Sequence, residues 1–346
     1  MQRPRFIALV ASLTLLSAAA GAGPITFTQV PTVFNNPVGI DYHEPTGQLA
    51  LSVNYPTGSP LNFELVQPNG THVPFSTASG FTDEVKIATV RSGNMGGFTT
   101  GDLFTGNGVD GQIARISADG SSVSVFADLP GLGNGLMRGS LHVDRTGVFG
   151  GDLIAVTTEG QVWRVNSAGG TSPGPLANVE THLEGVLTVP NNPVFGLLAG
   201  RIIAGAEGQN LLYAIDSSGD VDSYNVGIPI EDIDFINANE NFFGVNFGTG
   251  RILTASASDF ASLVGGILLT REFPIPGTTG LYSLSWDAMS MSPVVSQLAL
   301  GAGSATVGQW EHVTFAPFQV NAPEPGSLLL LLGGLAGLMR ARRRQR

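Results

Sequence analysis

The sequence predicts an all-β fold, a β-propeller in which each four-stranded blade takes about 50 residues. Three observations predict it. The 346 residues include 47 glycines and 21 prolines, and both residue types interrupt helices. Two short sequence patterns recur with one shared period of about 50 residues. The hydrophobic fraction of 42% is enough for a packed core and excludes a disordered chain.

The first recurring pattern is a turn glycine followed at once by a short run of strand-forming residues. Its five copies are Gly47-Gln48-Leu49, Gly101-Asp102-Leu103, Gly151-Asp152-Leu153, Gly200-Arg201-Ile202 and Gly250-Arg251-Ile252. Successive glycines are 54, 50, 49 and 50 residues apart. A nearly constant spacing over five copies indicates a repeated structural unit.

The second pattern is a short apolar run that leads into a polar turn ending in glycine. Its turn glycines are Gly70, Gly120, Gly169 and Gly219, at steps of 50, 49 and 50 residues. A weaker fifth copy, Leu281-Tyr282-Ser283-Leu284, comes about twenty residues late, after an insertion within 237–277. Polar turns of this kind place glycine where the backbone needs a positive φ.

Each repeat contains about four short strand-forming runs, which is the composition of one propeller blade. The innermost strands are predicted at Val38–Tyr42, Glu84–Ala88, Leu141–Asp144, Gly185–Val189, Asp232–Ile236 and His312–Ala316. We expect six blades, with five or seven as alternatives, and we expect Ile25–Val30 to close the ring by pairing with the last blade. The competing folds are a β-sandwich, which has no 50-residue period, and a β-helix, whose repeats are much shorter.

This periodicity resembles that of the six-bladed group that holds the NHL-repeat and lactonase-like proteins. The resemblance implies a propeller with six blades. Lactonase-type propellers hold a divalent metal in their central channel with acidic and amide side chains, and this sequence offers the acids without a matching motif.

The N-terminal segment 1–22 is typical of a secretory signal peptide. Arg3 and Arg5 precede an apolar run of 11 residues, Phe6–Leu16, which is too short to span a membrane. Small residues follow, and they offer cleavage after Ala20 or Ala22. The sequence therefore predicts export, and the absence of cysteine excludes a disulfide scaffold and thiolate chemistry.

The C-terminal segment 321–346 has three parts in a fixed order. Pro323, Glu324 and Pro325 are followed by the apolar run Gly326–Met339 and then by an arginine-rich end. As a helix, that run reaches about 21 Å, short of the ~30 Å hydrocarbon core. Arginine snorkelling makes it acceptable as a transient anchor, and the positive-inside rule places the main domain outside. The alternative is an ordinary C-terminal membrane tail.

This tail resembles the PEP-CTERM sorting signal of Gram-negative bacteria, in which Pro323, Glu324 and Pro325 match the name-giving motif. The resemblance implies processing by an exosortase, a membrane cysteine protease and transpeptidase. It also implies a transient inner-membrane anchor, then release to the cell surface or extracellular matrix, in an exopolysaccharide or biofilm context. It covers about 24 residues and implies nothing for the predicted propeller domain, residues 23–320.

Removing both ends takes away seven arginines and Glu324, which leaves 9 basic and 26 acidic residues. A net charge of about −17 repels phosphates, so we expect no nucleic-acid partner. An acidic surface of this kind attracts divalent cations.

Four carboxylates precede predicted inner strands and form one column of the repeat: Asp83, Glu184, Glu231 and Glu311. If the register holds, they surround one mouth of the central channel. Carboxylates held close together raise one another's pKa unless a cation neutralises them, and calcium prefers such oxygen ligands. The sequence therefore makes this column a candidate Ca²⁺ site, with solvated strand ends on an acidic protein as the alternative.

The sequence predicts no catalytic residue. The five histidines show no metal-binding pair at i, i+4 spacing, and Gly106–Gly111 matches a dinucleotide motif in sequence but lies between two predicted strands. The leading hypothesis is an exported binding or matrix propeller. The alternatives are a metal-dependent, lactonase-like hydrolase with its site in the channel, and an architectural protein with an empty channel.

Overall fold

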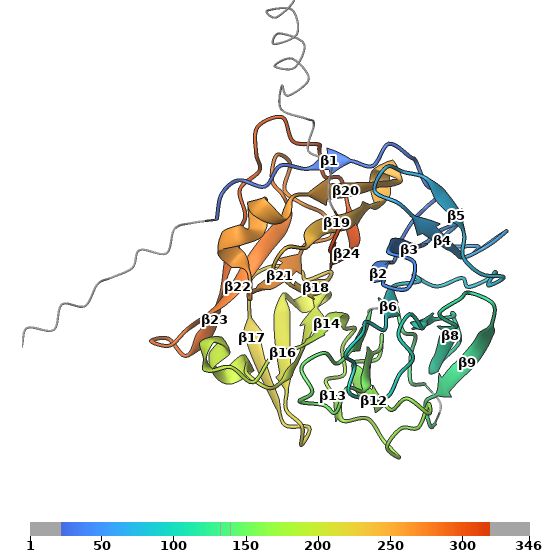
Figure 1. Ribbon diagram of the computed structural model, residues 1–346. Helices are drawn as coiled ribbons and strands as arrows, with labels where there is room; N and C mark the ends of the chain where they lie inside the picture. Colours follow the sequence, from blue (N-terminus) through green and yellow to red (C-terminus); the bar gives the residue numbers. More distant parts are fainter. Residues whose placement is uncertain (1–21, 132, 139, 319–346) are drawn as a thin grey trace, which may run out of the picture.

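Six four-stranded antiparallel sheets surround a common centre in the computed structural model of the chain, which describes residues 22–318 except 132 and 139 (Figure 1). The innermost strands contact one another in the order β2, β6, β10, β14, β18 and β24, and β24 contacts β2 again. The ring is therefore closed, and the fold is a six-bladed β-propeller, as the period predicts.

The first four blades are consecutive in sequence, each running from the innermost to the outermost strand. Blade 1 is β2 (Ile40–His43), β3 (Gln48–Ser52), β4 (Phe63–Val66) and β5 (His72–Pro74). Blade 2 is β6 (Ile87–Thr89), β7 (Leu103–Gly106), β8 (Gln112–Ile116) and β9 (Val123–Asp128). Blade 3 is β10 (Ser140–Val143), β11 (Leu153–Val156), β12 (Gln161–Val165) and β13 (Ala177–Asn178). Blade 4 is β14 (Glu184–Thr188), β15 (Ile202–Ala206), β16 (Leu211–Ile215) and β17 (Val221–Asn225).

The last two blades are interleaved in sequence. Blade 5 is β18 (Ile233–Phe235), β21 (Ile267–Thr270), β22 (Leu281–Asp287) and β23 (Ser292–Gln297). Blade 6 is β24 (Trp310–Ala316), β19 (Asn241–Asn246), β20 (Arg251–Ala255) and β1 (Thr28–Gln29). Four short 3-10 helices complete the described elements: η1 (Pro193–Leu198), η2 (Glu207–Gln209), η3 (Phe247–Thr249) and η4 (Ala257–Leu263).

This interleaving corrects one prediction. Gly250-Arg251-Ile252 was expected to open the second strand of the fifth repeat, but it opens β20, the third strand of blade 6. The predicted insertion within 237–277 is the β19–β20 hairpin with η4, placed between β18 and β21 of blade 5. The local sequence misleads because a glycine turn before an apolar strand looks the same at either position in a blade.

The predicted ring closure is confirmed. Thr28 pairs with Thr254 and Gln29 with Leu253, which makes β1 the outermost strand of blade 6. In Figure 1 the blue β1 lies beside the orange β20. All six predicted inner strands overlap the observed ones, with shifts of no more than about three residues at their ends.

Six hydrophobic clusters form the core, and each is shared between two neighbouring blades. Between blades 2 and 3, for example, Phe104 packs in one cluster with Leu153 and Trp163, all fully or almost fully buried. Because each sheet covers its apolar faces with its neighbours, a single blade has no complete core of its own.

The turn glycines of the second pattern lie where one blade approaches the preceding one. A Cβ on Gly169, whose φ is +79°, would clash with the carbonyl oxygen of Phe126 in β9 of blade 2. A Cβ on Gly219 would clash in the same way with the carbonyl oxygen of Leu176, beside β13 of blade 3. The 50-residue glycine spacing therefore has two causes, a positive φ and a close inter-blade approach.

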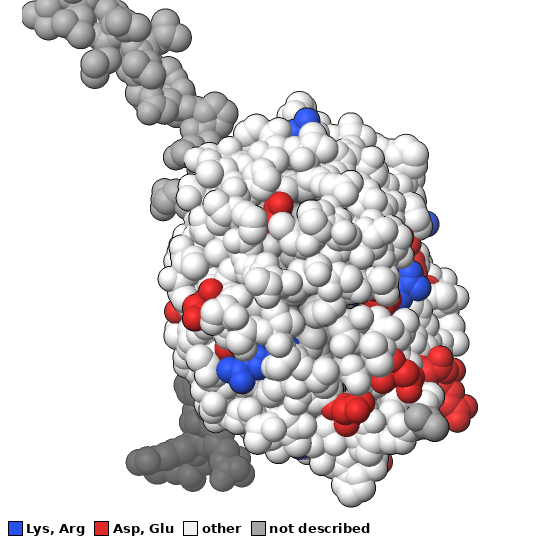
Figure 2. All heavy atoms as spheres, turned by 90° about the vertical axis from the view of Figure 1, so that its right-hand side faces the viewer, with Lys and Arg blue, Asp and Glu red and all other residues white. Residues whose placement is uncertain are grey.

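Charged side chains are sparse on the surface shown in Figure 2, where acidic groups gather toward one edge. Residues 1–21 of the predicted signal peptide, the Pro323-Glu324-Pro325 motif and the apolar run Gly326–Met339 lie outside the described residues. Within residues 22–318, leaving out 132 and 139, no helix has the length and apolar character that a membrane crossing requires.

Candidate functional site

The inner strands line a channel whose two ends carry different groups. Residues that precede inner strands meet at one end, where Arg138 before β10 pairs with Glu84 before β6. Residues that follow inner strands meet at the other end, where Arg91 after β6 pairs with Glu240 after β18. We call these the acidic mouth and the arginine mouth.

Lys86, the only lysine of the chain, lies fully buried at the acidic mouth. Its Nζ lies 2.7 Å from Oε2 of Glu184 and 2.5 Å from Oε1 of Glu231. Burial lowers the pKa of Lys86, but Glu184 and Glu231 outweigh it and hold the pKa well above the usual value. Lys86 is therefore a permanent cation that joins blade 2 to blades 4 and 5.

The predicted carboxylate column does gather at this mouth. Glu184 and Glu231 contact Lys86, and Glu311 accepts a hydrogen bond of 2.9 Å from Nε2 of Gln309. Asp83 lies 3.8 Å from Nε of Arg138, and its buried Oδ2 has no hydrogen-bond partner among the described residues. Sequence reasoning missed Lys86, although a sole lysine inside a predicted inner strand was a usable signal.

One ammonium does not neutralise all these carboxylates. Burial and the repulsion of Glu184 and Glu311 raise the pKa of Glu231 well above its usual value, despite the contact with Lys86. Burial and the neighbouring carboxylates Glu84, Glu272 and Glu184 raise the pKa of Glu311 to about 8. The acidic mouth therefore holds protons at neutral pH that an additional cation can replace.

A second set of carboxylates has Glu231 in common with the predicted column. Glu207 in η2, Glu231 and Glu272 each place an oxygen within 4.8 Å of the others. Burial and the approach of Glu207 raise the pKa of Glu272 to about 7. Oxygen ligands at this spacing suit a divalent cation such as calcium.

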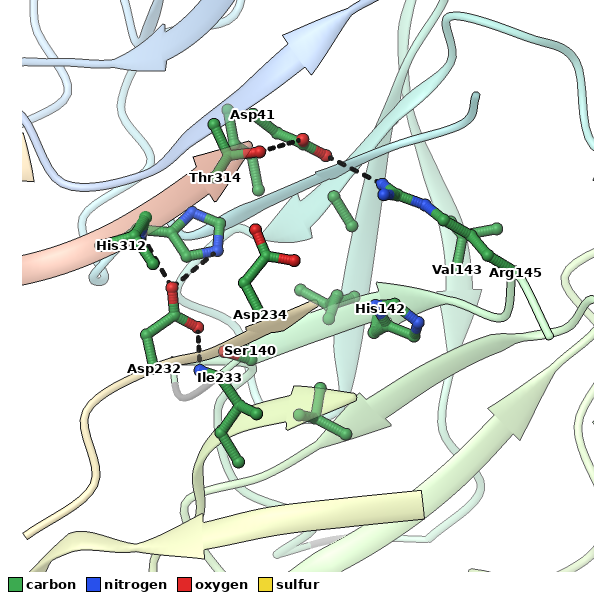
Figure 3. A pocket seen from close by; sticks show the side chains of 15 residues that line it. Asp41, Ser140, His142, Val143, Arg145, Asp232, Ile233, Asp234, His312 and Thr314 are labelled. Carbon is green, nitrogen blue, oxygen red and sulfur yellow. Dashed lines mark hydrogen bonds and ion pairs between the residues drawn. The ribbon is translucent and has the colours of Figure 1, made fainter. Parts of the chain in front are cut away.

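The middle of the channel is narrow and polar (Figure 3). The space there is about 30 Å³, enough for a water molecule or a small ion. Asp232 and Asp234 of the β18 segment, His312 of β24 and His142 of β10 line it. Nδ1 of His312 accepts a 3.0 Å hydrogen bond from the Ile40 N–H, which requires an unprotonated Nδ1.

Burial shifts the pKa of all four groups toward the uncharged form. Burial and Lys86 lower the pKa of His312 to about 3, and burial with Arg145 lowers that of His142 to about 3. Burial raises the pKa of both Asp232 and Asp234 to about 7. Each aspartate also accepts two backbone N–H groups, which orients its carboxyl group in the channel wall.

Asp41 of β2 organises the arginine mouth. It accepts hydrogen bonds from the Thr89 N–H and hydroxyl at 2.8 Å each, and from the Thr314 hydroxyl at 3.0 Å. Burial would raise the pKa of Asp41, but Arg91, Arg145 and these donors hold it at about 2. Asp41 is therefore ionised and lies 3.3 Å from Arg91.

A cavity of about 500 Å³ opens at the arginine mouth, between the ends of β10, β14 and β18. Its apolar side is formed by Val148, Leu187, Pro190 and Phe235. His142, Arg145 and Asp234 line both this cavity and the narrow centre, so the two spaces adjoin.

The fold and channel define the class of this protein as a six-bladed β-propeller with polar groups along its channel. A protein of unknown function from Bacteroides thetaiotaomicron is similar to it, with 11% identity and a TM-score of 0.50 over 84% of this chain and 70% of that one. Virginiamycin B lyase from Staphylococcus aureus is 12% identical, with a TM-score of 0.49 over 86% of this chain and 89% of that one. At these identities the similarity concerns the fold alone.

No protein-family model matches the chain, and no curated protein matches it.

Proposed function

We propose that this protein is an exported propeller displayed at the cell surface or in the extracellular matrix, where it binds a ligand, and that an exosortase-type enzyme processes its tail at Pro323-Glu324-Pro325. One observation carries the proposal. The strands of all six blades lie between Thr28 and Ala316. Cleavage of the predicted signal peptide 1–22 and of the tail 321–346 therefore leaves every blade with its four strands.

A propeller whose strands do not include the two terminal segments suits a protein in which those segments direct export and sorting and are then removed. The acidic composition of the remaining domain keeps such a protein soluble outside the cell. The channel supports binding better than turnover, because one central charged group at each mouth is held by other protein groups. Lys86 is held by Glu184 and Glu231, and Asp41 by Thr89 and Thr314.

The test is fractionation of a Gram-negative host that has an exosortase, followed by mass spectrometry of the two ends of the mature chain. The wild-type protein should lose both ends and reach the surface or medium. Glu324→Ala should accumulate in the membrane fraction with its tail attached. Glu159→Ala, an exposed glutamate in the propeller, is the matched control and should be processed normally. Normal release of Glu324→Ala would overturn recognition through this motif.

The second candidate function is a metal-dependent hydrolase of the lactonase kind, with Ca²⁺ at the acidic mouth. The Glu207–Glu231–Glu272 group and the raised pKa of Glu272 favour a cation there. Of the four predicted ligands, Glu231 belongs to this group, and Glu184 contacts the same lysine, Lys86, as Glu231 does. The other two, Asp83 and Glu311, lie nearby.

A calcium titration followed by thermal unfolding tests the metal site. Ca²⁺ should raise the Tm of the wild-type protein, and the increase should disappear in Glu272→Gln. Asp128→Asn changes an exposed acid of β9 and should keep the wild-type increase. No increase in the wild-type protein would remove the metal site and the hydrolase with it. An increase without hydrolysis of lactone or ester substrates would leave the binding role.

A further inference from the structure

The cavity at the arginine mouth has the size and the lining of a small-molecule site. Its volume of about 500 Å³ falls within the range of ligand pockets, roughly 300–1,000 Å³. Its walls come from three successive blades, through the last residues of β10, β14 and β18 and the residues that follow them. It lies at the opposite end of the inner strands from the carboxylates of the acidic mouth, so the two sites are distinct.

Arg145 supplies the positive charge of this cavity. The side chain is 36% exposed, and its closest ionic contact in the described part of the chain is Oδ2 of Asp41, at 3.9 Å. A guanidinium group has five N–H donors in a planar fork that matches a carboxylate. At 3.9 Å the Asp41 contact is longer than a charge-assisted hydrogen bond and does not occupy that fork.

Asp41 cannot satisfy Arg145, because other donors already use its oxygens. Oδ2 accepts from the N–H and the hydroxyl of Thr89, and Oδ1 accepts from the Tyr42 N–H, the Thr314 hydroxyl and Arg91. A carboxylate offers about four lone-pair sites, so these five donors exhaust it. Asp234 lines the same cavity but forms no ion pair with Arg145 among the described residues, so the Arg145 fork is left available to an anion from outside the protein.

Four of the residues that line this cavity are apolar. Leu187 is buried, while Val148, Pro190 and Phe235 are half-buried, so the last three present apolar surface to the cavity. Covering that surface with the hydrocarbon part of a ligand removes apolar area from water, which is favourable. The Thr188 hydroxyl, which also lines the cavity, lies 3.1 Å from Nε2 of His142.

We propose that the cavity binds a small organic monocarboxylate, with the carboxylate on Arg145 and an apolar chain or aromatic ring against Val148, Leu187, Pro190 and Phe235. The inference deepens the proposed binding role by naming its site and ligand class. Phosphate esters and neutral sugars are the competing ligands, and they become outcomes of the test.

The probes are 4-phenylbutyrate, indole-3-acetate and octanoate, with 4-phenylbutanol as the uncharged analogue of the first. Ligand-observed NMR titrations of the propeller, residues 23–320, measure Kd. At least one of the three carboxylates should bind with a Kd below about 10 mM. The carboxylate 4-phenylbutyrate should bind about tenfold or more tightly than its uncharged analogue, 4-phenylbutanol. Equal binding of 4-phenylbutyrate and 4-phenylbutanol, or binding by none of the three carboxylates, would overturn the proposal. So would tighter binding of phenyl phosphate or glucose than of every carboxylate.

Two variants locate the site. Arg145→Gln should weaken carboxylate binding about tenfold or more, and Val148→Trp should block the cavity while leaving the charge in place. Arg115→Gln is the matched control, because the Arg115 side chain is 37% exposed but pairs at 2.7 Å with Asp102 in blade 2. Unchanged binding by Arg145→Gln would overturn the assignment. Failure of the export proposal shows in the fractionation experiment and leaves these titrations unaffected.

Discussion

The ammonium group of Lys86 lies 2.7 Å from the carboxylate of Glu184, although 98 residues separate the two in sequence. Both side chains are almost completely buried, and Glu231 contacts the same ammonium from a third blade. A lysine placed this deeply requires its partners, because an unpaired buried charge is among the most costly groups in a protein. The three residues therefore connect blades 2, 4 and 5 across the channel.

The first prediction concerns this cluster. Lys86→Met should lower the free energy of unfolding by about 3–5 kcal/mol, because it removes the ammonium from two buried carboxylates and leaves Glu184 only its 2.9 Å contact with His182. Urea unfolding followed by circular dichroism measures the loss. The triple variant Lys86→Met, Glu184→Gln, Glu231→Gln should recover much of it, since no buried charge remains in the cluster. A Lys86→Met protein within about 1 kcal/mol of wild type would contradict this account.

The second prediction concerns acid stability. The pKa of His312 is about 3 in the folded chain, against a usual value near 6.5. Between these values the unfolded chain binds a proton that the folded chain excludes, so this group's contribution to stability falls as the pH drops from 6.5 toward 3. His312→Gln should therefore reduce the loss of stability between pH 6.5 and pH 4 by about 2–3 kcal/mol.

Unfolding by urea at several pH values measures this difference. His72→Gln, which changes the exposed histidine of β5, is the control and should follow the wild-type curve. Asp232 and Asp234 act in the opposite direction. Their raised pKa makes the folded chain hold protons between about pH 4 and 7, so their contribution to stability falls as the pH rises. Both aspartates are present in the wild-type protein and in the two variants, so their contribution does not distinguish the three curves. Parallel curves for wild type and His312→Gln would contradict the prediction.

The third prediction concerns the closing strand. Phe27 is 1% exposed, and its ring centroid lies 5.5 Å from that of Trp310 and 5.8 Å from that of Phe242. Phe27→Ala should cost about 3–5 kcal/mol through lost burial and the cavity that remains. Gln29→Ala, which changes an exposed residue of β1, should stay within about 0.5 kcal/mol of wild type. Equal effects of the two substitutions on urea unfolding would show that this segment contributes little to blade 6.

The fourth prediction separates the two causes of the glycine pattern. Gly169 and Gly80 both have φ +79°, but a Cβ on Gly80 has no atom within 4 Å. Gly80→Ala should therefore cost only the left-handed backbone penalty, about 1–2 kcal/mol. Gly169→Ala should cost clearly more, because its Cβ meets the Phe126 carbonyl of the neighbouring blade. Similar midpoints in thermal unfolding for the two variants would contradict the inter-blade contact.

Much of the fold could be predicted from the sequence, because the turn glycines report a contact that recurs once per blade. The six inner strands and the closing role of the N-terminal strand follow from that period. The interleaving of blades 5 and 6 in sequence could not be predicted. Gly250 opens β20 with the same turn and strand pattern that Gly200 uses to open β15, and only tertiary pairing distinguishes them.

The candidate site was predictable in part. The position of a residue before an inner strand places it at one end of the channel, and this placed Glu184, Glu231 and Glu311 correctly. Their partner Lys86 was missed, because a lysine in a strand is usually exposed; the one available signal was that the chain's only lysine lies inside a predicted inner strand. The cavity beside Arg145 depends on three blades at once, and no single stretch of sequence describes it.

The sharing of blade 6 between both ends of the chain sets a limit on the order of assembly. The β19–β20 hairpin is made before its inner partner β24, more than fifty residues later, so synthesis must pass residue 316 before the ring can close. Until then the apolar faces of blades 5 and 1 that flank the gap stay open to water and to other chains. Any nascent or truncated form that stops before Trp310 is therefore a substrate for chaperones and proteases rather than a smaller stable protein.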